Sequence, residues 1–181
     1  MIDRVLPSRL RRPVIGAPMA GGPTTPALIA AVGEAGGMGV MGSGGPGAAA
    51  PPEEIARVRA VTGAPFGVNV FLLDPADSAA ALAAAGGVAA LDRYSAAIAP
   101  VADRLGIALA EAPAFTDFDQ AATLAALVQD PVPVVSFTFG IPGAGVVRAL
   151  QEVGSAVVVP VAGEGDARRA MEAGADWLSV Q

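Results

Sequence analysis

Short apolar runs alternate with longer segments of helical character along most of the chain. Six of these runs are typical of buried strands, because each is four to six residues long and mostly apolar. They are residues 13–17, 38–41, 66–71, 134–137, 156–161 and 177–180. A strand that is apolar throughout is expected where both faces of a sheet are covered.

A helix is predicted in each of the five intervals between these strands, at residues 27–35, 52–61, 118–129, 143–153 and 166–173. The first has clear end signals: Thr24 or Thr25 can cap it, Pro26 suits its first turn, and a Gly-Gly pair follows it. Repeated strand–helix units favour an α/β fold, with a parallel sheet and helices outside.

One segment, residues 74–131, does not fit a single strand–helix unit. It contains helical patterns at 79–85 and 88–105, and a possible short strand at 106–110. We therefore expect a single domain over residues 1–181 with a helical elaboration at about 74–131. The Gly-, Pro- and Ala-rich stretch 42–52 is predicted to be a plain connecting loop rather than a lid.

Composition excludes several kinds of chemistry. The chain has no cysteine, histidine or lysine, so thiolates, imidazole bases and Schiff-base lysines are absent. No motif suggests a metal site. The net charge of −6 without a basic patch argues against nucleic acid. No stretch approaches the ~20 strongly apolar residues of a membrane span, and prolines interrupt the only signal-like segment. We expect a cytoplasmic protein.

The opening segment, from Arg12 to Gly45, is the most informative. Its first strand runs directly into Pro18-Met19-Ala20-Gly21-Gly22, a small-residue turn on which something planar can settle. This segment resembles the opening of the nitronate monooxygenase family. Further matching pieces follow in the same order, and they are FGVNVF at 66–71, VSFTFG at 135–140, and AGAD at 173–176 leading to Val180-Gln181.

The resemblance implies an FMN-dependent TIM (β/α)8-type barrel. Such a barrel usually takes ~250 residues, so we expect an incomplete one, with about six of eight strands and an extra helical crossover. Six strands leave two unpaired sheet edges. The resemblance also implies that strands seven and eight, with the flavin phosphate site, lie beyond Gln181. The chain is then a fragment, or a completing chain or second copy supplies the rest.

The resemblance also places residues around the flavin. Pro18, Met19 and Ala20 would lie beside its ring, unless that turn only packs the barrel mouth. Asn69 is an amide inside an apolar strand and needs hydrogen-bond partners. It can satisfy neighbouring backbone, or it can bond a flavin edge as the matching residue does in the family. Gln181 would contact the flavin in the same way.

Thr138 stands where well-studied members of the family have a catalytic histidine. A hydroxyl of very high pKa cannot act as a general base near pH 7, although Thr138 can bond a substrate oxygen or a flavin edge, or simply fill the end of the barrel. Neutral nitroalkanes are then expected to be poor substrates. Ser136 is predicted to face away from the site, and Asp74 is interpreted as a loop residue.

The resemblance implies an FMN-dependent monooxygenase that oxidises alkyl nitronates with O2. One alternative is an NAD(P)H-dependent flavin reductase acting on quinones or enoyl-thioesters. The other is a truncated, non-catalytic barrel fragment. The expected partners are a small-molecule substrate and O2, without nucleic acid or membrane.

Overall fold

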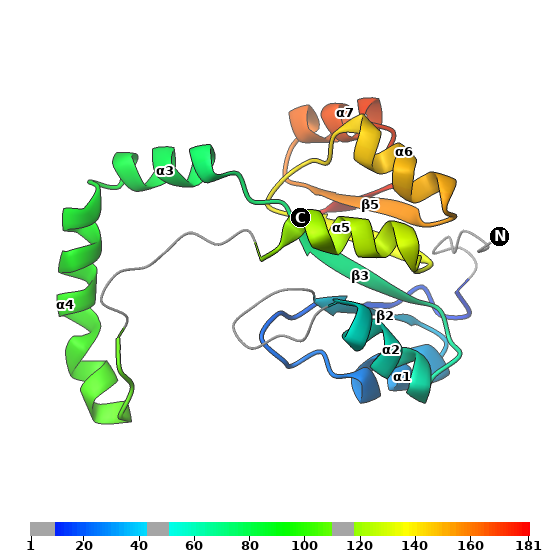
Figure 1. Ribbon diagram of the computed structural model, residues 1–181, viewed down its shortest axis with the longest axis horizontal. Coiled ribbons are helices and arrows are strands. Elements are labelled where there is room, and N and C mark those ends of the chain that lie inside the picture. The colour runs from blue at the N-terminus through cyan, green and yellow to red at the C-terminus, as the bar shows by residue number, and fades with distance from the viewer. Residues whose placement is uncertain (1–9, 43–50, 110–117) are drawn as a thin grey trace. The chain divides into compact units, whose positions relative to one another are not determined.

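Six parallel strands, paired in chain order, form one sheet in the computed structural model, which describes residues 10–42, 51–109 and 118–181 (Figure 1). The strands are β1 (Ile15–Gly16), β2 (Met38–Gly42), β3 (Phe66–Phe71), β4 (Val134–Thr138), β5 (Ala156–Val161) and β6 (Trp177–Val180). The predicted α/β fold, a barrel with about six strands, is confirmed.

Helices connect these strands, and the chain divides into two compact units. The first unit, Met1–Leu72 with Phe118–Gln181, holds the sheet and five helices in its described part. They are α1 (Pro26–Glu34), α2 (Pro51–Val61), α5 (Gln120–Gln129), α6 (Ala144–Glu152) and α7 (Glu164–Glu172). The second unit, Leu73–Asp117, contains α3 (Pro75–Ala84) and α4 (Val88–Leu105). The assignment of the whole chain to one partial barrel domain stays a prediction.

Local capping explains where several helices begin. The Thr25 hydroxyl accepts a hydrogen bond from the Leu28 N–H at 3.2 Å and so caps α1, as one of the two expected candidates. Helix α7 begins at Glu164, two residues before the expected start, because Gly163 is its N-cap. Ile107 to Leu109 form no strand, and the rest of the possible strand at 106–110 lies outside the described residues. Most of the predicted loop at 42–52 lies outside them too, and α2 already begins at Pro51.

The two faces of the sheet have different surroundings. Residues such as Val68, Phe137 and Val159 point to the face that the helices cover, where they join Ile29, Leu127 and other helical residues in the main core. Met38, Val40, Val134 and Ala156 form a separate buried cluster on the opposite face, which contains no residue of a helix. The helices therefore cover one face, and the other belongs to the barrel interior.

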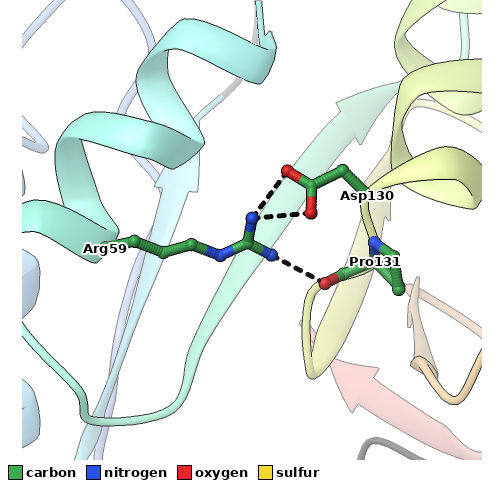
Figure 2. A network of polar contacts seen from close by, with 3 residues as sticks. All are labelled: Arg59, Asp130 and Pro131. Atoms are coloured by element: carbon green, nitrogen blue, oxygen red, sulfur yellow. Dashed lines mark hydrogen bonds and ion pairs between the residues drawn. The ribbon is translucent and has the colours of Figure 1, made fainter.

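An arginine clamp fastens α2 to the segment that leads into β4 (Figure 2). The Arg59 Nη1 group donates to both carboxylate oxygens of Asp130 at 2.6 Å, and Nη2 donates to the Pro131 carbonyl oxygen at 2.9 Å. Both side chains are about half exposed. The clamp fixes the start of the strand that presents Ser136 and Thr138.

No described helix is both long and apolar enough to cross a membrane.

Candidate functional site

A cavity of about 340 Å³ lies on the face of the sheet that the helices leave uncovered. Its lining includes residues from all six strands, from Ile15 on β1 to Trp177 on β6. The first and last strands can line the same cavity only if the sheet curls into part of a barrel. Met38, Val40 and Val134 give the cavity an apolar part. The volume is at the lower end of the range for small-molecule sites.

Three polar side chains form a row across this cavity. Asn69, on β3, is only 3% exposed, and its Oδ1 atom accepts hydrogen bonds from the Ser136 hydroxyl at 2.8 Å and the Thr138 hydroxyl at 3.0 Å. We call these three residues the polar row. Two donors on one oxygen fix the orientation of the amide.

The prediction that Ser136 faces away from the site is wrong. Side chains two residues apart in a strand share a face, so Ser136 accompanies Thr138 into the cavity. Phe137, between them, is 1% exposed and packs in the core against the helices. Strict application of the two-residue period from Thr138 would have found Ser136 from the sequence.

The turn after β1 lies over the end of β2. Pro18 lines the cavity, whereas Met19 and Ala20 are not among its lining residues. A Cβ atom added at Gly42 would lie 3.0 Å from the Ala20 backbone nitrogen, so this close approach depends on glycine at the end of β2. Thr24 does not cap α1; its hydroxyl accepts a hydrogen bond from the Met19 N–H at 2.8 Å and holds the turn closed.

Gln181 lines the cavity at the end of β6, beside Trp177 and Ser179. Its backbone N–H donates to the Val161 carbonyl oxygen at 3.1 Å and extends the pairing of β5 with β6. The Asp176 carboxylate accepts from the Val157 N–H at 2.8 Å and fixes the entry to β6. Trp177 and Ser179 were not predicted, although alternation back from Gln181 indicates both.

The part of the chain that the structure describes contributes no titratable side chain and no cation to the cavity lining. Asp74 has a structural role instead, because its carboxylate accepts a hydrogen bond from the Ala76 N–H at 2.7 Å and caps α3. Among the described residues, no group of acidic side chains could hold a metal ion. The arrangement can bind a planar polar group by hydrogen bonds, but it offers no side chain for proton abstraction.

Comparisons with known proteins agree with this geometry. The family model for nitronate monooxygenase matches residues 7–181. The chain is 34% identical over 176 residues to a nitronate monooxygenase of Paraburkholderia phytofirmans, covering 94% of this chain and 45% of the relative. It is 35% identical over 173 residues to a nitronate monooxygenase of Pseudomonas aeruginosa, covering 95% of this chain and 47% of the relative.

A solved structure is also similar. The crystal structure of nitroalkane oxidase from Streptomyces ansochromogenes superposes with a TM-score of 0.82 at 37% identity, covering 97% of this chain and 47% of that protein. The chain thus spans a little under half the length of the relatives it matches.

Proposed function

This chain belongs to the nitronate monooxygenase family, and we propose that it forms the flavin-binding face of an FMN-dependent oxidoreductase. That enzyme would oxidise alkyl nitronates with O2. The family is generally flavin-dependent. The observation that carries the proposal is the polar row of Asn69, Ser136 and Thr138 on the inner face of a six-stranded partial barrel.

The residues of the cavity fit the ring system of a flavin. A flavin ring is flat and largely apolar, with hydrogen-bonding atoms along one edge. The cavity offers apolar surface from Met38, Val40 and Val134, and polar groups from the polar row and Gln181. Its described lining includes no arginine for the phosphate. The fit is therefore to the ring, and the phosphate would need donors from outside this lining.

FMN, when bound, supplies the redox chemistry by taking electrons from the substrate and passing them to O2. The chain's own residues would bind and orient. The NH2 group of Asn69 and the side-chain amide of Gln181 would bond the polar edge of the ring. Pro18 would pack beside the ring, with Met19 and Ala20 at the turn above it.

Thr138 would orient the substrate rather than remove its proton. Its hydroxyl donates to Asn69 Oδ1 at 3.0 Å. A nitronate has only acceptor oxygens, so the hydroxyl would turn from Asn69 and donate to a nitronate oxygen when the substrate binds. Because the described lining offers no base, we expect the substrate to arrive already deprotonated. A nitronate anion meets this requirement, whereas a neutral nitroalkane does not.

A second candidate is an NAD(P)H-dependent flavin reductase that acts on quinones or enoyl-thioesters. The lack of a base in the described cavity lining favours this candidate too, because delivery of a hydride to a flavin requires no base to deprotonate the donor. Oxidation of NADH or NADPH under anaerobic conditions in the presence of a quinone would separate it from nitronate oxidation.

The first test is retention of FMN by the purified chain. Trp177 is the only tryptophan and lines the cavity, so bound flavin is expected to quench its fluorescence. The visible spectrum is recorded after addition of FMN and desalting, and Trp177 emission is followed during titration. Asn69→Leu should weaken binding at least tenfold, and Arg57→Met, an exposed change on α2, should not. A chain that retains no flavin and shows no quenching would overturn the proposal.

The second test compares substrate forms. The flavin-loaded chain should oxidise the nitronate of 1-nitropropane at a rate at least a hundredfold above that of neutral 1-nitropropane at the same pH. Equal rates for the two forms would show that a base outside the described lining acts, and would contradict the role given to Thr138.

A further inference from the structure

Three phenylalanines gather at the carboxyl ends of β3 and β4. The ring centroid of Phe71 lies 5.2 Å from that of Phe139 and 5.7 Å from that of Phe118, the latter in an edge-to-face arrangement. Both separations lie within the range of favourable aromatic pairs. We call these three residues the aromatic rim.

The aromatic rim continues the inner face of the barrel outward from the polar row. Phe71 is two residues after Asn69 on β3, so both belong to the same face of that strand. In the parallel register, Asn69 lies opposite Ser136 and Phe71 lies opposite Thr138, which itself lines the cavity. Phe139 directly follows Thr138, and its ring packs on Phe71. None of the three rings is among the residues that line the cavity, but Phe139 directly follows the lining residue Thr138. The rim therefore lies next to the cavity at the carboxyl ends of the strands, where barrel enzymes place their sites.

Phe139 combines two unfavourable features. Its φ angle is +72°, a left-handed conformation that is rare for a bulky residue, and its side chain is 72% exposed. A strained backbone is normally offset by burial or by function. Since most of this ring faces water, burial does not offset the strain, and the position beside the cavity indicates a ligand contact.

We propose that Phe139 and Phe71 bind the hydrocarbon group of the substrate, and that the substrates are nitronates with long alkyl or aryl groups rather than the smallest ones. This inference rests on the proposed function, which places the anionic end of the substrate near Thr138. The hydrocarbon end then extends toward the rim. Contact with the exposed ring of Phe139 removes apolar surface from water on both partners.

The test uses carboxylates as unreactive planar anions of increasing length: propionate, pentanoate and heptanoate. Their dissociation constants are measured on the FMN-loaded chain from the change in the flavin spectrum. For the unmodified chain, affinity should rise with length by up to about fourfold for each methylene group that is buried. Phe139→Ser should flatten this dependence and leave propionate binding within twofold. Phe139→Leu, which keeps apolar bulk, should restore most of it.

Tyr94→Ser is the matched control, because Tyr94 is an aromatic side chain of similar exposure, 64%, on α4. It should leave all three dissociation constants unchanged. A flat series for the unmodified chain, or an equal slope in Phe139→Ser, would overturn the inference while the proposed function stands. A large fall in the urea midpoint of Phe139→Ser would also overturn it, by showing that the ring serves the core. A chain that holds no FMN would overturn both proposals.

Discussion

Removing Asn69 alone should destabilise the protein more than removing the whole polar row. In Asn69→Leu, the Ser136 and Thr138 hydroxyls lose the oxygen to which both donate, at 2.8 and 3.0 Å. A buried donor left without a partner costs about 1–3 kcal/mol. Both hydroxyls are only partly buried, so the lower end applies, and the two together should cost about 2 kcal/mol.

The triple variant Asn69→Leu, Ser136→Ala, Thr138→Val removes the donors along with the acceptor. No polar atom of the row is then left unpaired, and the free energy of unfolding should recover by at least about 1 kcal/mol relative to Asn69→Leu. Ser136→Ala and Thr138→Val should each cost about 1 kcal/mol by themselves. The triple variant should nevertheless fail to retain FMN, because it lacks the Asn69 amide.

The assay is urea unfolding followed by Trp177 fluorescence, with the slope compared across variants so that a change in midpoint can be read as a change in stability. Ser179→Ala, an exposed serine of the same cavity wall on β6, is the control and should stay within about 0.5 kcal/mol of the parent. If the triple variant is as unstable as the sum of its three single changes, the three side chains do not act as one hydrogen-bonded unit and the reasoning is refuted.

Three further predictions follow from separate parts of the molecule. Phe139→Gly should have a free energy of unfolding about 1 kcal/mol higher than Phe139→Ala in urea, because only glycine accepts φ = +72° without strain. Equal stabilities of the two variants would show that the backbone at this position is not strained. Arg59→Met should lower the free energy of unfolding by about 1 kcal/mol through loss of the hydrogen bonds to Asp130. Arg57→Met is the control and should change it by less than about 0.5 kcal/mol, because the 3.8 Å pair of Arg57 with Glu53 is more exposed. Similar losses in the two variants would show that the contact with Asp130 adds no stability. FMN and riboflavin should bind the chain with dissociation constants within about threefold in a Trp177 quenching titration, because the described cavity lining has no cation. Charge-assisted phosphate contacts of roughly 1.5–3 kcal/mol each would instead favour FMN at least tenfold.

Much of the candidate site could be predicted from single residues. Asn69, inside the apolar strand at 66–71, was an evident polar position, and the structure places it in the cavity with Thr138, Pro18 and Gln181. The role of each toward a flavin stays a prediction. The expectation for Ser136 is wrong, because the two-residue period of a strand places its side chain on the same face as that of Thr138.

Local patterns determined the strands, most helix ends to within two residues, and the parallel direction of the strands. Apolar runs, caps and glycine stops act over a few residues, so β3, β5 and β6 have the predicted bounds of 66–71, 156–161 and 177–180. The tertiary structure alone decided which side chains meet. Asn69 and Ser136 are 67 residues apart, and only the register between β3 and β4 sets the amide oxygen against two hydroxyls. Likewise, only the packing of the strand ends brings the exposed ring of Phe139 onto Phe71. Contacts at such separations depend on how the strands align in the sheet, and no local pattern of residues specifies that alignment.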